Sequence, residues 1–339
     1  MRLRRIGVLV TGFTALAIAG CTAAPTAPPP TSPGAAYVSA YEAPAVPVPA
    51  PLSGVAVKPG SLDHPSLAAK IDNHPDARPQ TGLERADIVF EELVEGGLTR
   101  YLAVWHSHIP ADIGPVRSIR PMDPDIASPT AGLLAYSGGQ PQFVAMIQAT
   151  ELVTATEGNP AFFRTTDNFA PHNLHVRAKQ FVDANRDVAA PPPQHFAFSN
   201  RADDSSSARF GKRTTRIDVS FSTFSNPSWS WHRRDAAWRR TQSGAADLDA
   251  SGRQLAATNV IVMRVAIDNS YGDVPKTVLV GSGDAWIGTG GSVLPVHWSK
   301  DSRTAPIRFT DAEGATVRVA PGNTWIELMP AYGSVDFAR

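Results

Sequence analysis

The chain has 339 residues, and its 31 basic and 31 acidic residues give a formal net charge of zero. Three arginines lie in the first 20 residues, which leaves 28 basic against 31 acidic residues in the remainder. This balance gives no support to nucleic-acid binding, which normally requires a basic face, and it disfavours electrostatic adhesion to anionic lipid. The length suffices for one or two ordinary hydrophobic cores.

Residues 1–20, MRLRRIGVLVTGFTALAIAG, place a basic head before a short apolar run. This pattern predicts a secretory signal peptide rather than a membrane-spanning helix. The run ends in IAGC, which resembles the lipobox of bacterial lipoproteins, and Cys21 is the only cysteine of the chain. We expect cleavage before Cys21 and lipidation of its thiol. The alternative is an ordinary signal peptide followed by an accidental cysteine.

Residues 21–59 hold Cys21 and the stretch TAAPTAPPPTSPGAAYVSAYEAPAVPVPAPL. Proline and alanine dominate this stretch without periodicity, which indicates a linker with polyproline II character. The sequence therefore predicts an exported protein anchored through lipid to the outer face of the bacterial cell membrane, with the lipid bilayer as a partner.

Residues 60–200 predict an α/β or α+β domain. The segments ADIVFEEL and TRYLAVWHSH alternate apolar and polar residues as strands do, and Gly96 and Gly97 mark a turn between them. The segment DPDIASPTAGLLAYSGG predicts a short helix that runs into a buried strand, and QPQFVAMIQAT has helical spacing.

Residues 213–335 predict a mostly antiparallel β domain. Pro- and Ser-rich text between 187 and 213 marks the boundary or a loop. Short apolar runs then recur every eight to twelve residues with Gly, Asp and Asn at the breaks. Strands are expected at TRIDVSFSTF, NVIVMRVAI, KTVLVGSG, DAWIGTGG, SVLPVHWS, PIRFTD, ATVRVA and NTWIELMP.

Two arginines, Arg117 and Arg120, follow the apolar run YLAVWHSH in GPVRSIRPMD. Because arginine keeps its charge, such a pair answers an anion, either a carboxylate of the protein or a group of a ligand. Glu91 and Glu95 in VFEELVEGG are expected to point together whether the segment is helix or strand. They could bind a cation, divide acid and base roles, or pair with the arginines, and a salt-bridged rim is the structural alternative.

A second polar cluster, APHNLHVRA, contains His172 and Asn173. A neutral histidine can act as a base near pH 7, whereas a helix start capped by Asn173 is the alternative. The turn SGGQPQ contains Gly138 and Gly139 and resembles a strand-to-helix turn. Its backbone N–H groups could meet an anion, or the glycines could merely allow the turn.

Metal, cofactor and serine-nucleophile motifs are weak. No histidine pair at helical zinc spacing is accompanied by a glutamate, and no Gly-rich loop carries the lysine of a nucleotide cradle. No serine stands in a GxSxG frame. We therefore expect no metal ion and no cofactor.

Several long motifs resemble the YerB-like bacterial lipoproteins, a family with a domain of unknown function. NHPDARPQTGLERADIVFEELVEGGLTRYLAVW, GPVRSIRP, YSGGQPQ and PHNLH resemble its N-terminal domain, and NVIVM, GSGDAWIGTGG, HWSKDSRTAPIRF and GNTWIELMP its C-terminal domain. The resemblance implies a lipid-anchored, extracytoplasmic, two-domain protein without naming a reaction. Asp72 departs from the residue that the family often has there.

The sequence predicts a protein that binds an anionic or glycan-phosphate envelope ligand in an arginine-lined cleft. The alternatives are an envelope hydrolase or transferase acting on a glycosidic or phosphodiester bond, and a structural or partner-binding module. A cell-wall polymer or an envelope protein is the expected partner, and nucleic acid is not. The predicted ligand-binding residues are Arg78, Arg100, Arg117, Arg120, Gly138, Gly139 and Asn173, and the predicted acid–base residues are His74, Glu91 and His172.

Overall fold

The structure is a computed structural model that describes residues 43–130 and 132–339. The chain divides into two compact units, Met1–Pro44 and Ala45–Arg339, and the fold described below is that of the second. The predicted signal peptide, Cys21 and much of the predicted linker lie outside the described residues. Within the described ranges, no helix has the length and apolar character needed to cross a membrane.

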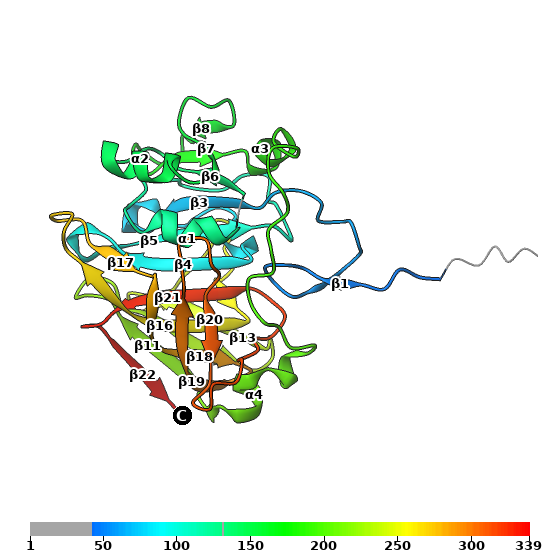
Figure 1. Ribbon diagram of the computed structural model, residues 1–339. Coiled ribbons are helices and arrows are strands. Elements are labelled where there is room, and N and C mark those ends of the chain that lie inside the picture. Colours follow the sequence, from blue (N-terminus) through cyan, green and yellow to red (C-terminus); the bar gives the residue numbers. More distant parts are fainter. Residues whose placement is uncertain (1–42, 131) are drawn as a thin grey trace, which may run out of the picture. The chain divides into compact units, whose positions relative to one another are not determined.

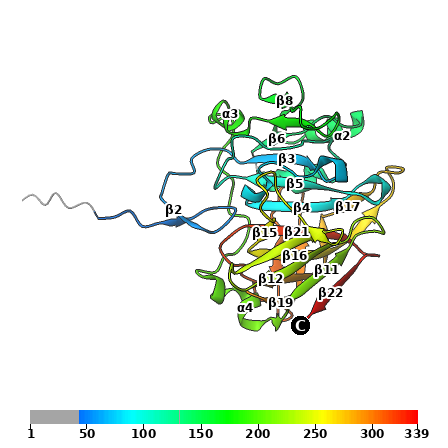
Figure 2. The same ribbon diagram turned by 180° about the vertical axis from the view of Figure 1, so that it is seen from behind.

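A twelve-stranded sheet dominates the unit Ala45–Arg339 (Figures 1 and 2). Its strands are β3 (Leu67–Asp72), β4 (Ile88–Leu93), β5 (Thr99–Trp105), β6 (Leu133–Ala135), β7 (Val153–Ala155), β10 (Lys212–Arg213), β16 (Asn259–Asp268), β17 (Lys276–Val278), β18 (Gly281–Thr289), β19 (Ser292–Lys300), β20 (Arg308–Thr310) and β21 (Thr324–Pro330). The order is β10-β19-β18-β16-β21-β4-β5-β3-β6-β7, with β17 on β16 and β20 on β19.

The pairing confirms a mixed sheet in the first half of the chain. β3, β6 and β7 run parallel, whereas β5 is antiparallel to both β3 and β4. The strands β16, β18 and β19 of the second half are antiparallel, as expected. β21 differs, because it pairs in parallel with both β16 and β4 and so joins the two halves in one sheet.

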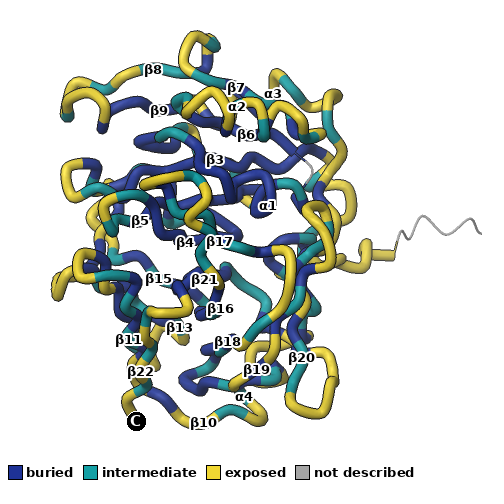
Figure 3. The backbone as a smooth tube through the Cα atoms, turned by 60° about the vertical axis from the view of Figure 1, so that its left-hand side comes forward, coloured by how far each residue is buried: buried dark blue, intermediate teal, exposed yellow. Residues whose placement is uncertain are grey.

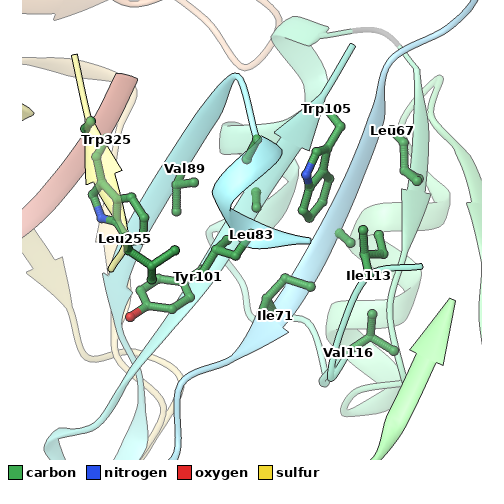
Figure 4. Packing of buried hydrophobic residues seen from close by; sticks show 14 of the residues in the cluster. Leu67, Ile71, Leu83, Val89, Tyr101, Trp105, Ile113, Val116, Leu255 and Trp325 are labelled. Carbon is green, nitrogen blue, oxygen red and sulfur yellow. The ribbon is translucent and has the colours of Figure 1, made fainter. Parts of the chain in front are cut away.

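A second, six-stranded sheet covers one face of the first. It contains β11 (Arg216–Ser220), β12 (Pro227–His232), β13 (Ala237–Gln242), β14 (Ala245–Ala246), β15 (Ala256–Ala257) and β22 (Ser334–Ala338). Trp229 of this sheet lies edge-on to Trp325 of β21, with ring centroids 5.2 Å apart, and Trp325 meets Tyr101 of β5 at 5.2 Å. Figure 4 shows Tyr101 and Trp325 in this core together with Leu255.

The helices α1 (Asp123–Ala127) and α2 (Pro141–Gln148) cover the opposite face of the large sheet (Figure 1), whereas Phe181 and Val182 of α3 (Ala178–Asp183) belong to the cluster on the first face. Ile126 of α1 and Phe143 of α2 belong to the same buried cluster as Leu102 and Leu134 of the sheet. The helices are α1 (Asp123–Ala127), α2 (Pro141–Gln148), α3 (Ala178–Asp183) and α4 (Ser206–Phe210), with short 3-10 turns η1 (Pro75–Ala77), η2 (Leu83–Arg85), η3 (Glu95–Gly97), η4 (Ser128–Thr130) and η5 (Ala202–Asp204). Two small sheets pair β1 (Val48–Pro49) with β2 (Ala56–Val57) and β8 (Phe162–Arg164) with β9 (Leu174–Val176).

The central strands are buried on both faces, as the dark segments of Figure 3 show. Along β4, Phe90 packs with the helical layer and Val89 with the second sheet. Because consecutive side chains of a strand alternate between faces, the neighbours Glu91 and Glu92 enter opposite layers. Both glutamates are 0% exposed.

Most of the predicted elements are confirmed, including β4, β5, α2 and the turn at Gly96 and Gly97, whose φ angles are 71° and 73°. The strand expected at ATVRVA is wrong, since Thr316 and Val319 make only isolated bridges. The strands β12 and β13 were not predicted. A domain boundary between 200 and 213 stays a prediction, and this stretch holds η5 and α4.

Candidate functional site

The candidate site lies where β3 ends. β6 pairs with the first half of β3. The extended segment 113–117 pairs with the second half of β3 on the same edge, because Arg117 N donates to Lys70 O at 2.8 Å and Asp72 N donates to Pro115 O at 2.9 Å. On its other side, this segment bonds to β9, where Val116 N donates to Leu174 O at 2.7 Å. The backbone pairing thus brings together the end of β3, the segment 113–117 and the loop before β9.

Asp72, the last residue of β3, is the centre of the site. Its Oδ2 lies 2.8 Å from Nδ1 of His172 and 3.0 Å from Nε of Arg117. Its Oδ1 accepts a hydrogen bond from the backbone N–H of His74 at 3.0 Å. The Asp72 side chain is only 3% exposed, so its charge depends on these contacts.

The two predicted histidines meet beside Asp72. The rings of His74 and His172 stack, with centroids 4.7 Å apart and planes inclined by 20°. The edge of Phe169 packs on His172 at 5.6 Å. Asp76 follows in the 3-10 turn η1, and one donor atom each from His74, Asp76 and His172 lies within 4.8 Å of the others. This trio is the set of described residues that could hold a metal ion, and the sequence analysis did not anticipate it.

Of the four predicted ligand-binding arginines, Arg117 is the one that contacts Asp72, and its side chain is 23% exposed. Arg78 is instead bound by Asn73, whose Oδ1 accepts from Nε at 3.0 Å and from Nη2 at 2.6 Å. Asn73 also donates to Thr99 Oγ1 at 2.8 Å. Arg78 therefore stabilises the turn after β3.

Arg100 and Arg120 pair with a carboxylate of the protein, that of Glu95. Arg120 Nε donates to Glu95 Oε2 at 2.7 Å, and a second nitrogen of Arg120 bonds Oε1, while Arg100 Nη2 lies 3.7 Å from Oε1. Burial would raise the pKa of Glu95, but the hydrogen bonds and charge of Arg120 outweigh it and lower this pKa to about 2. Burial, followed by the charge of Arg120, lowers the pKa of Arg100 to about 10.

The prediction that Glu91 and Glu95 point together is wrong. β4 ends at Leu93, and Glu95 begins the turn η3 toward Arg120. Glu91 enters the layer between the two sheets, where it accepts hydrogen bonds from Arg240 Nη2 at 2.6 Å and Thr99 Oγ1 at 2.7 Å. The fold therefore does not bring this predicted acid–base residue to His172.

Gly138 and Gly139 form the predicted strand-to-helix turn between β6 and α2. Gly138 O accepts from Ile119 N at 3.0 Å, and Ser137 N donates to Arg117 O at 3.0 Å, so the turn supports the arginine segment. Asn173 holds its own loop: its Nδ2 donates to Thr165 O at 2.9 Å. The helix start considered at Asn173 is wrong, because β9 begins at the next residue.

A buried ion-pair cluster beside the site was also missed. Lys70 of β3 pairs with Glu92 of β4 and donates to Asp123 Oδ1 at 2.8 Å, and all three side chains are fully buried. Burial, opposed by Asp123, lowers the pKa of Lys70 to about 8. A lysine inside a strand whose neighbours are all apolar is the sequence signal for such a cluster.

A cavity of about 460 Å³ lies in the second half of the chain. Its lining includes Arg213, Arg233 and Arg339 together with Trp231. Among the ion pairs found in the described part of the chain, none involves these three arginines. The sequence analysis selected none of them, because they are scattered through the chain without a motif.

Comparisons with known proteins agree with this fold. Residues 52–190 match the description "Protein of unknown function (DUF3048) N-terminal domain", and residues 217–326 match the corresponding C-terminal domain. The chain is 24% identical to "Putative lipoprotein YerB" of Bacillus subtilis (strain 168), across 86% of this chain and 88% of the relative. The crystal structure of the YerB protein from Bacillus subtilis shares the fold, with a TM-score of 0.75, 21% identity, and coverage of 85% of this chain and 99% of that one. The chain therefore belongs to the DUF3048 family, with both of its domains present and YerB among its relatives.

Proposed function

We propose that this protein is an exported, lipid-anchored envelope protein that binds an anionic group of an envelope ligand at Asp72, Arg117 and His172. The observation that supports this site is the shared oxygen of Asp72, which holds Arg117 by Nε and His172 by Nδ1. Within the described residues, no hydrogen bond uses Nη1 or Nη2 of Arg117 or Nε2 of His172. The terminal N–H groups of Arg117 are left to donate to an anionic group. Nε2 of His172 is an acceptor while Nδ1 donates to Asp72, and it is left for a hydroxyl of the same ligand.

Arginine is the residue that suits this role. Its planar guanidinium offers parallel N–H groups that match a carboxylate or a phosphate, and partial exposure gives a ligand access to them. The buried Asp72 fixes the orientation of the guanidinium from behind. A lipid anchor at Cys21 would place the site among the polymers of the envelope, which supplies phosphate and carboxylate groups.

Acid–base catalysis at the same residues is the second candidate function. A carboxylate on Nδ1 of a histidine fixes the tautomer that leaves Nε2 as a proton acceptor, and this is how Asp72 meets His172. Beside Arg117, such a base suits hydrolysis or transfer at a glycosidic or phosphodiester bond. Release of product from purified envelope polymers distinguishes catalysis from binding alone.

The binding proposal is tested by calorimetric titration of the full chain in detergent and EDTA with inorganic phosphate and with a uronic acid. We expect Arg117→Ala to weaken binding about tenfold or more and also to lower the thermal midpoint, because it removes a charge partner of the buried Asp72, so binding is compared well below that midpoint. Arg233→Ala, which alters the 460 Å³ cavity, is the matched control. Loss of binding in the control but not in Arg117→Ala, or no binding by the unaltered protein, would refute this site.

The anchor is tested separately by Cys21→Ser. We expect the unaltered protein to fractionate with membranes and to incorporate labelled fatty acid, and the variant to do neither, because its thiol is gone. The name of the Bacillus relative supports this expectation. Equal membrane association of the variant would mean that the protein is attached in another way, whereas release of the unaltered protein without fatty acid would favour the ordinary signal peptide.

A further inference from the structure

We propose that His74, Asp76 and His172 bind a divalent transition-metal ion such as zinc. Their donor atoms already lie within 4.8 Å of one another. Two imidazoles and one carboxylate form a ligand set that such ions accept, with the remaining coordination position open to water or a substrate.

Asp72 supplies the supporting contact that a metal-binding histidine requires. Its carboxylate occupies Nδ1 of His172 at 2.8 Å, which leaves Nε2 as the nitrogen available for a metal. The same carboxylate accepts the backbone N–H of His74 at 3.0 Å. One buried side chain thus positions two of the three ligands, and metal sites use such carboxylate–histidine contacts to orient their ligands.

Asn168 connects the segments that carry the ligands. Its side-chain nitrogen donates to Asp76 O at 2.5 Å and to His172 O at 3.2 Å. The turn after β3 and the loop before β9 are therefore tied together on both sides of the trio. The backbone segments that carry the three ligands are therefore held in place by hydrogen bonds that do not depend on a metal.

Small side-chain rotations complete the coordination. Tetrahedral zinc with bonds of about 2.0–2.1 Å holds its ligand atoms about 3.4 Å apart, so the distances within the trio must shorten by up to about 1.4 Å. The ring of His74 must also turn so that one of its nitrogens and Nε2 of His172 face the same point. The side chains of His74 and Asp76 are 36% and 52% exposed and can move, whereas His172 is 8% exposed and forms the fixed side.

The metal would add positive charge next to Arg117, so that an anionic group at the open coordination position would also meet the guanidinium. This last step rests on the proposed function, but metal binding itself does not. Titration of phosphate in EDTA tests the anion site, and titration of metal in phosphate-free buffer tests the metal site. The two experiments can therefore give opposite results, so the metal site and the anion site are tested independently.

The experiment is calorimetric titration of the EDTA-treated full chain in detergent with zinc, followed by cobalt(II) absorption spectra. We expect one equivalent to bind, with loss of binding in both His74→Ala and Asp76→Ala, which alter exposed side chains and leave the core intact. Asp72→Asn should weaken binding about 10–100-fold. The control is His232→Ala, which removes an exposed histidine 3.0 Å from Asp235.

Binding of one equivalent that survives in the control and disappears in the two ligand variants supports the proposal. No binding by the unaltered protein, or binding that both ligand variants retain, overturns it. Visible cobalt bands that indicate tetrahedral coordination, absent in His74→Ala, would separate this site from weak surface histidines.

Discussion

Asp72 shows how a single buried carboxylate organises a polar site. Its 3% exposed side chain pairs with Arg117, accepts the N–H of His74 and contacts the ring of His172. A buried charge without such partners would cost several kcal/mol, so the three contacts are what allow an aspartate at the end of this strand. The orientation of His172 follows from the same requirement.

A second buried charge cluster connects the two sheets. Arg240 pairs with Glu91 and Asp247, so one positive charge already faces two carboxylates. Glu327 is the Cα partner of Glu91 across β21 and β4, and its Oε1 accepts from Trp229 Nε1 at 2.7 Å. Burial, followed by the neighbouring Glu91, raises the pKa of Glu327 well above its usual range.

We predict opposite effects for Glu327→Gln and Glu91→Gln. The folded-state pKa of Glu327 is raised, so its contribution to stability is fully present below pH 4.5 and declines as pH rises toward the folded-state value. Glu327→Gln removes this decline. Relative to the unaltered protein, its free energy of unfolding should therefore increase by up to about 1.4 kcal/mol for each pH unit above 4.5. Glu91→Gln leaves Arg240 with Asp247 alone and should cost about 3–5 kcal/mol near pH 5. This cost should fall as pH rises, because without the charge of Glu91 the carboxyl of Glu327 can ionise beside Arg240.

Urea unfolding between pH 5 and pH 8 measures both effects. Because both variants replace a buried glutamate with glutamine, a difference between their effects shows which of the two glutamates is charged in the folded protein. A free-energy difference between Glu327→Gln and the unaltered protein that does not change with pH would mean that Glu327 is ionised when folded.

The residue types identified part of the candidate site. Arg117, His74 and His172 were selected from chemistry alone, and the structure brings them together. Asp72 and Asp76 were not selected from the sequence, although Asp72 lies at the centre of the site. The contact between Asp72 and His172 spans 100 residues of sequence, and no local pattern encodes a pairing over that distance.

At the scale of elements, the two arginines separate because only Arg117 belongs to the extended segment 113–117 beside β3. Arg117 pairs there with Asp72, whereas Arg120, beyond that segment, pairs with Glu95. The carbonyl of Ser118 between them accepts from Arg100 Nη1 at 2.8 Å and from Arg120 Nη1 at 3.2 Å. A shared clamp on one ligand was the expectation from spacing, and the backbone conformation opposes it.

Strand existence was easier to predict than strand pairing. Alternating or continuous apolar runs identified β4, β5, β16, β18, β19 and β21. The strands β12 and β13 were missed because PSWSWH and AWRRTQ mix aromatic with charged or hydroxyl residues on their outer faces. The parallel pairing of β21 with β4 depends on residues more than two hundred positions apart, beyond what periodicity reports.

For the whole molecule, the continuous sheet couples the two family domains. β21 lies between β16 and β4, and hydrogen-bonded pairing runs through all three. Ion pairs cross between the same halves of the chain: Arg240 meets Glu91 at 2.6 Å, and Arg303 meets Asp125 at 3.2 Å. The indole of Trp229, from the second half, belongs to the same buried cluster as Val89 and Tyr101 of the first half.

We therefore predict that the two halves open together. Removal of the second half would expose the edge of β4 and the apolar side chains that the second sheet covers, such as Val89 and Tyr101, so we expect the first half not to remain folded by itself. Hydrogen exchange followed by mass spectrometry should give peptides of β5 and β13 the same opening free energy and the same urea dependence. Coincident unfolding by tryptophan fluorescence and far-UV circular dichroism would accompany this result. If peptides of β13 exchanged through a separate opening of lower free energy, while β5 stayed protected, the sheet would not act as one cooperative unit.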